Sequence, residues 1–179
     1  FHYEFHPSAV PFNAPFGRPA GHRSLSRSLT SSEPVRVTAR FFPHGDTRAA
    51  HVLALFRATA GFTSTGGTVP TDMPNEGFGL LLSKSGASST NSSISLLRFN
   101  GTATPVTLAS QSTSAQFSAG SFDVEFGRTM SGGLSAKVSS GAALAVLCVS
   151  AASGIGLPDS FGIFDLEGGV SYDTTPNPA

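Results

Sequence analysis

Alternation of apolar and polar side chains along most of the chain is the feature that most restricts its fold. In residues 35–41, apolar side chains alternate with Arg36, Thr38 and Arg40. A period of two places successive side chains on opposite faces of a β-strand. The same signal recurs at residues 94–99, 106–108, 122–126, 134–139, 144–148, 161–163 and 170–172, whereas the strands expected at 51–58 and 78–82 are more fully apolar. No segment combines the period of an α-helix with helix caps, so the sequence predicts an all-β domain.

The apolar members of each alternating set are expected to face one common core. In residues 144–148 that set is Leu144, Val146 and Cys148. Residues 51–58 are apolar on both sides, which predicts a central strand covered on both faces. Cys148 is the only cysteine and lies in an apolar run, which favours a buried, inert thiol.

Glycine-containing links separate the predicted strands. Asn100-Gly101 is a frequent hairpin turn, and the pairs Gly132-Gly133 and Gly168-Gly169 provide similar links. Short strands with regular turn signals indicate an antiparallel β-sandwich or barrel. Residues 59–76, rich in glycine, threonine and proline, are expected to form one long irregular surface loop.

Charge and length limit the classes of partner. The 179 residues fit one domain, and the formal net charge is zero. A neutral chain has no general attraction to nucleic acid or to an anionic membrane surface. No apolar stretch approaches the roughly 20 residues that cross a bilayer as a helix. We therefore expect neither a nucleic-acid nor a membrane partner.

Residues 1–34 differ from the rest, and we predict an extended arm there and a β-sandwich domain at 35–179. The arm holds five prolines together with aromatic and arginine residues. Residues 1–57 carry seven arginines against three acidic residues (+4), whereas residues 58–179 carry four basic against eight acidic residues (−4). Such an arm suits contacts with a neighbouring subunit. The predicted partner-binding residues are Phe5, Phe12, Phe16, Arg18, Arg23 and Arg27. The alternative is that the arm covers its own sandwich and supplies an edge strand around residues 23–29.

The order of the strands resembles the concanavalin A-like or laminin-G-like jelly roll. The resemblance lies in residues 35–42 (VRVTARFF), 76–82 (EGFGLLL), 94–100 (ISLLRFN) and 122–149, and in the closing strands at 161–164 and 170–173. Modules of this kind occur in secreted adhesion proteins, sugar-binding proteins, glycosidases and bacteriophage virion proteins. The texture rich in glycine, serine and alanine looks most like the virion class, which implies an extracellular or virion location.

The resemblance also implies a structural calcium ion. In many laminin-G-like modules, an acidic residue on the last strand holds Ca²⁺ together with loop carbonyls. Asp173 occupies the matching place and Asp165 lies nearby in the sequence. No other cofactor is expected, because the five histidines show no zinc-binding spacing.

Asp123 and Glu125 are the candidates for catalysis. Residues at i and i+2 of a strand share a face, and glycosidases of the resembled fold use the ladder Glu-x-Asp-x-Glu. Here the first position holds Asp123 and the third holds Gly127. Alternation alone explains both carboxylates as solvent-facing polar residues. No Gly-x-Ser-x-Gly nucleophile motif occurs either, so we expect a protein that is not an enzyme.

The sequence thus favours a non-enzymatic structural or adhesive module of a larger extracellular assembly. A virion decoration or tail component anchored by the arm to protein subunits of the same assembly, in oligomeric form, is the leading interpretation. The alternative is a carbohydrate-binding module with Asp72, Asn75 and Glu76 as sugar ligands. Its weakness is the lack of tryptophan, since sugar sites usually present an aromatic platform. A glycoside hydrolase using Asp123 and Glu125 is the third hypothesis.

Overall fold

A computed structural model describes residues 21–24, 33–41, 49–64, 72–84, 92–102, 104–114, 122–150 and 157–165. These residues form β-strands and one short 3₁₀ helix. The elements are β1 (Gly21–Ser24), β2 (Val35–Phe41), β3 (Ala49–Phe56), η2 (Ala58–Ala60), β4 (Phe62–Ser64), β5 (Asp72–Pro74), β6 (Gly77–Lys84), β7 (Ser92–Phe99), β8 (Val106–Thr113), β9 (Phe122–Arg128), β10 (Leu134–Ser140), β11 (Ala143–Val149) and β12 (Ser160–Asp165).

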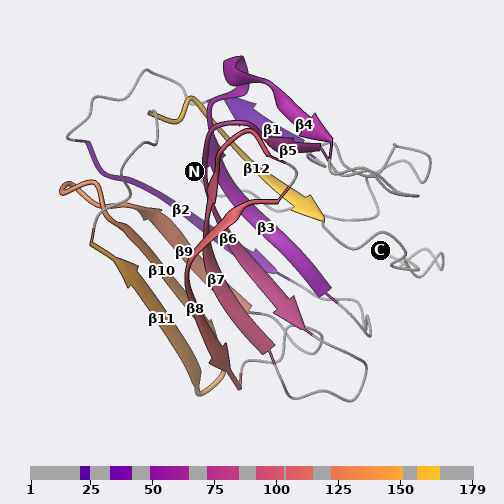
Figure 1. Ribbon diagram of the computed structural model, residues 1–179. Coiled ribbons are helices and arrows are strands. Elements are labelled where there is room, and N and C mark those ends of the chain that lie inside the picture. Colours follow the sequence, from indigo (N-terminus) through magenta and orange to yellow (C-terminus); the bar gives the residue numbers. More distant parts are fainter. Residues whose placement is uncertain are drawn as a thin grey trace, which may run out of the picture.

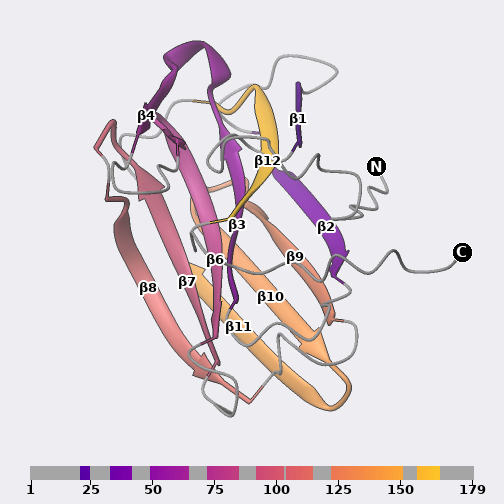
Figure 2. The ribbon, with the colours of Figure 1, turned by 90° about the vertical axis from the view of Figure 1, so that its right-hand side faces the viewer.

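The strands form two large sheets that lie one over the other (Figures 1 and 2). The six-stranded sheet has the order β1-β12-β3-β6-β7-β8, and the four-stranded sheet has the order β11-β10-β9-β2. All neighbouring strands pair antiparallel. The predicted all-β antiparallel fold is therefore confirmed.

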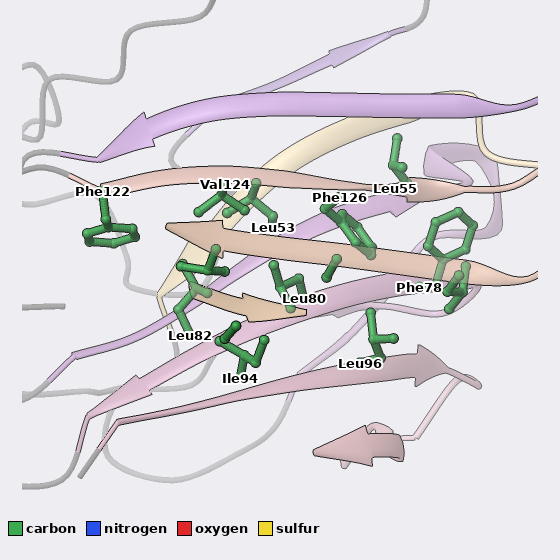
Figure 3. Packing of buried hydrophobic residues seen from close by; sticks show 14 residues of the cluster. Leu53, Leu55, Phe78, Leu80, Leu82, Ile94, Leu96, Phe122, Val124 and Phe126 are labelled. Carbon is green, nitrogen blue, oxygen red and sulfur yellow. The ribbon is translucent and has the colours of Figure 1, made fainter. Parts of the chain in front are cut away.

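The main core lies between the two sheets (Figure 3). Alternate side chains of β6 and β9 meet there, and the rings of Phe78 and Phe126 pack edge to face with centroids 5.6 Å apart. Such a pair adds about 0.5–1.5 kcal/mol to the burial of the two rings. The buried residues of this core are Leu53, Leu55, Phe78, Leu80, Leu82, Ile94, Leu96, Phe122, Val124, Phe126, Leu134, Ala136, Val138 and Ala145.

A second apolar cluster lies on the other face of the six-stranded sheet. Strand β3 is buried on both faces, as predicted for a central strand: Leu53 and Leu55 face the main core, and Val52 and Phe56 belong to the second cluster. Met73 of β5 is 1% exposed and joins the second cluster. Residues 59–76 are thus not a wholly irregular loop, because β4 and β5 pair within this stretch and cover one end of the sheet.

Strand β11 reverses a prediction made from its sequence. Its inward side chains are those of Ala143, Ala145, Leu147 and Val149, whereas Leu144 and Val146 are 58% and 50% exposed. Cys148 is exposed as well, so the expectation of a buried thiol was wrong. The physical reason is that β11 is apolar on both faces, and alternation cannot identify the inner face of such a strand.

Part of the predicted arm belongs to the six-stranded sheet. Strand β1 pairs antiparallel with β12, with Arg23 opposite Phe161. The edge strand that the sequence left open as an alternative is therefore present, at Gly21–Ser24. Residues 1–20 and 25–32 lie outside the described residues.

Candidate functional site

The outward side of the four-stranded sheet carries the most distinctive surface of the described residues. We call it the outer face. Because side chains alternate along a strand, each of its four strands contributes every second residue. The outer face comprises Arg36, Thr38 and Arg40 of β2, Asp123 and Glu125 of β9, Ser135, Lys137 and Ser139 of β10, and Leu144, Val146 and Cys148 of β11.

Asp123 is held by a two-pronged ion pair from the neighbouring strand. The register places Arg40 opposite Asp123, and Nε and Nη2 of Arg40 donate hydrogen bonds of 2.6 and 2.9 Å to the two carboxylate oxygens. The hydrogen bonds from Arg40 lower the pKa of the Asp123 carboxyl. A general acid needs the opposite shift, a raised pKa, so this ion pair does not suit Asp123 to the role of a general acid.

Glu125 lies between two cations. Nη1 of Arg36 donates a hydrogen bond of 3.3 Å to Oε2, and Nζ of Lys137 lies 3.9 Å from Oε1. Both carboxylates of the glycosidase hypothesis are thus engaged by basic side chains on β2 and β10. Exposed pairs of this kind contribute little to stability individually, but they fix which charges neighbour each other on the surface.

Strand β11 forms an uncharged margin of the outer face. We call the side chains of Leu144, Val146 and Cys148 the apolar edge strip. Strand β11 has one neighbour, β10, so its other side is a sheet edge (Figure 1). The strip therefore combines exposed apolar side chains with a strand edge that lacks a partner in the described part of the chain.

The four edges of the two sheets differ in how they are protected. Proteins usually shield sheet edges with short strands, charges, prolines or bulges. Strand β1 has only four residues, β2 carries Arg36 and Arg40, and β8 is mainly polar and pairs with β7 through a register shift at Leu96/Leu97. Strand β11 has seven residues, an unbroken register, and no charge, proline or glycine. It is the unguarded edge of the described structure.

Two of the predicted sugar ligands, Asn75 and Glu76, make their side-chain contacts within the loop that contains them. The side-chain amide of Asn75 donates to the carbonyl of Ala60 at 3.0 Å and accepts from the hydroxyl of Thr63 at 2.5 Å. Glu76 pairs with Arg57 at 3.1 Å. The structure thus brings Asn75 and Glu76 together but engages both within residues 57–76. Asp72 begins β5, and its side chain lies outside the description.

Asp159 is a polar anchor that sequence reasoning missed. Its carboxylate accepts hydrogen bonds from the backbone N–H of Ala58 at 2.8 Å and from the hydroxyl of Ser160 at 2.9 Å. Burial acts to raise the pKa of this carboxyl, but these hydrogen bonds, that of Thr59 and the charge of Arg57 outweigh it, so the pKa is lowered. Asp159 thereby ties the start of β12 to η2, a contact that no local motif signals.

The side chains of the remaining predicted site residues lie outside the described part of the chain. Asp165 ends β12, and its side chain is not described; Asp173, Phe5, Phe12, Phe16, Arg18 and Arg27 lie in undescribed segments. Among the residues with described positions, no group of three or more His, Cys, Asp or Glu side chains could hold a metal ion. Within the same residues, no helix has the length and apolar character to cross a bilayer.

The chain matched none of the protein-family models, and the searches of curated proteins and of solved structures likewise found no match.

Proposed function

We propose that this chain is a non-enzymatic structural or adhesive module of a larger extracellular assembly, and that it contacts its partner through the apolar edge strip. The observation that carries the proposal is the unguarded edge. On this uncharged edge strand, Leu144 is 58% exposed and Val146 is 50% exposed. An exposed, regular and apolar edge is a template for strand pairing with another chain.

The polar chemistry of the same face fits this role better than catalysis. Arg40 occupies both oxygens of Asp123, and Glu125 lies between Arg36 and Lys137. These pairs cancel most of the charge on three of the four strands of the outer face. A surface of paired charges beside an apolar margin resembles the rim and core of a protein interface.

The finer assignment extends the same proposal. We assign the sandwich jelly-roll connectivity, because the chain passes between the two sheets after β1, β2, β8 and β11 and every sheet neighbour is antiparallel. A virion decoration or tail component is the kind of assembly we favour, since the sequence texture resembles that class. Residues 1–34 form a second anchor in this proposal, with β1 fastening that segment to its own sheet.

The size of the native particle tests the proposal. The chain, tagged and expressed in its native source, should sediment as part of a complex well above its own mass of 18.3 kDa. The double variant Leu144→Ser/Val146→Ser should leave that complex. The matched control is Val106→Ser, which changes an exposed apolar side chain on the edge strand β8 and should stay in the complex.

Two results would count against the proposal. One is a native particle with the mass of a single chain. The other is a complex that retains the double variant as firmly as it retains the unmodified protein.

A further inference from the structure

We infer that the partner at the apolar edge strip is a second copy of this chain, joined by antiparallel pairing of β11 with β11 about a two-fold axis. The inference rests on the proposed function and names the partner of the same site. It joins the two four-stranded sheets into one continuous sheet. Two-fold dimers are the commonest form of oligomer, and a strand edge pairs with itself in this way.

The regularity of β11 makes it suitable for this pairing. Its register with β10 runs without a shift from Leu134 opposite Val149 to Ser140 opposite Ala143. Its buried inner face, with Ala145 1% exposed, fixes the strand against the core. At the turn before it, Gly141 has φ +55° and no neighbouring atom within 4 Å of the position a Cβ would take, so that turn is open to solvent. The edge of β11 is therefore regular along its whole length.

The side chains of the strip are compatible with a copy of themselves. With the two-fold axis at Val146, this residue lies opposite Val146 of the second copy. Leu144 then lies opposite Cys148 of the second copy, and Cys148 lies opposite its Leu144. Every outward pair is apolar, and cross-strand side-chain pairs are the contacts through which neighbouring strands stabilise each other.

The charge pattern permits a second copy at this edge. The chain has a formal net charge of zero, so two copies have no overall repulsion. The nearest charged side chain is Lys137, which lies opposite Val146 on β10. In the dimer the two Lys137 side chains are three strand spacings apart, about 14 Å, which exceeds the screening length of roughly 8–10 Å at physiological salt. Each also keeps Glu125 as its own counter-charge.

The expected dimer is a weak one. The contact is one strand edge with three outward side chains, which places it among the small interfaces that dissociate on dilution. Self-association should therefore depend on protein concentration, and this dependence is the quantity to measure.

Sedimentation velocity on the purified chain over a wide concentration range, with a reducing agent present, tests the pairing. The unmodified chain should shift from monomer to dimer as its concentration rises. Val146→Lys, which places a charge against its own copy, should weaken the dimer at least tenfold. Thr38→Lys adds the same charge to the same face at the opposite edge, opposite Glu125, and should leave the dimer unchanged.

Leu144→Lys provides a second test that does not depend on the folding of one variant. Leu144 and Val146 are both about half exposed or more, so both lysines point into solvent in the monomer, and circular dichroism should match the unmodified chain. A chain that stays monomeric at millimolar concentration overturns the inference. So does a dimer that both folded lysine variants preserve.

The register is tested by a disulfide. Under mild oxidation Leu144→Cys should form covalent dimers, because the new thiol faces Cys148 of the second copy. Adding Cys148→Ser to that variant should abolish the cross-link, since two residues at position 144 lie about 14 Å apart along the paired strands. A confirmed dimer without the first cross-link overturns the register centred on Val146.

The outcome also separates this inference from the proposed function. A purified chain that remains monomeric, together with a large native particle that requires Leu144 and Val146, overturns the self-pairing and keeps the assembly role. A single-chain particle in both settings overturns both.

Discussion

The two edge strands of the four-stranded sheet, β2 and β11, differ in how they and their neighbouring strands protect the edge against pairing. Strand β2 and strand β11 both have seven residues and both pack apolar side chains into the same core. On the outer face, β2 carries two arginines that pair with carboxylates on β9. Strand β11 carries Leu144, Val146 and Cys148 instead, beside the mostly neutral β10. The edge at β2 is thus protected by charges against pairing with another chain, and the edge at β11 has no such protection.

Protection of a sheet edge depends on two strands, the edge strand itself and its neighbour. An arginine on an edge strand is best placed where the next strand offers an acidic partner, as Asp123 does for Arg40. The carboxylates nearest to β11 are those of Asp123 and Glu125, which lie two strands away on β9 and are already engaged by basic side chains. The charged half of the outer face and its apolar half at β11 therefore both follow from the position of the carboxylates on β9.

The largest difference in stability is expected between substitutions on the two faces of β11. Ala145→Asp places a carboxylate between the sheets, where an unpaired buried charge costs about 3–5 kcal/mol, so this variant should unfold or nearly unfold. Val146→Asp, one residue on, points outward and should change the free energy of unfolding by no more than about 0.5 kcal/mol in dilute solution. Urea denaturation measures both. Equal losses would show that β11 lacks the inner and outer faces described here.

An intermediate effect on stability is expected where the edge strand β2 packs against its neighbour β9. A Cβ on Gly127 of β9 would lie 2.0 Å from the carbonyl oxygen of Val35 on β2, so Gly127→Ala must push the strands apart. Overpacking of this kind costs about 1–3 kcal/mol, and we expect the upper end. Gly141→Ala, at a turn with open space around it, should cost only the strain of its positive φ, about 1 kcal/mol. Thermal unfolding of the two variants ranks them, and the reverse order would contradict the packing of β2 on β9.

The smallest effect concerns pH. Because the folded-state pKa of Asp123 is lowered by Arg40, the ion pair stabilises the fold above the ordinary carboxyl pKa of 3.8, and this contribution is lost as the pH falls through the folded value. Asp123→Asn should lower Tm at pH 7 by no more than about 3 °C, as expected for an exposed pair. The difference between variant and parent should vanish at strongly acidic pH. A difference that persists there would assign the effect to packing instead of charge.

Alternation or a fully apolar run predicted most of the strands, whereas a mainly polar edge strand and a short strand pair within a loop were missed. Strands β2, β9 and β10 alternate clearly and appear where expected. The extension of β8 to Thr113 was missed, because an exposed edge of serine, threonine and glutamine has no apolar alternation. The β4–β5 pair was missed because its anchor, Met73, packs on a face formed by β3 and β7, which are distant in the sequence.

The outer face could be predicted only in part. Alternation correctly placed Asp123 and Glu125 on one polar face, but their arginine partners lie 83 and 89 residues away and become neighbours only through the β2–β9 register. The unguarded edge did leave a trace in the sequence. Residues 143–149 contain no charge, proline or glycine, a composition that is hazardous at a sheet edge unless another chain covers it.

Amide hydrogen exchange at low and at high protein concentration tests the difference between the two edges most directly. We predict that exchange in β11 slows as the concentration rises, because its outward N–H groups become paired, while exchange in β2 stays the same. Exchange in β11 that is independent of concentration, or equal slowing in both strands, would show that the two edges do not differ in this way.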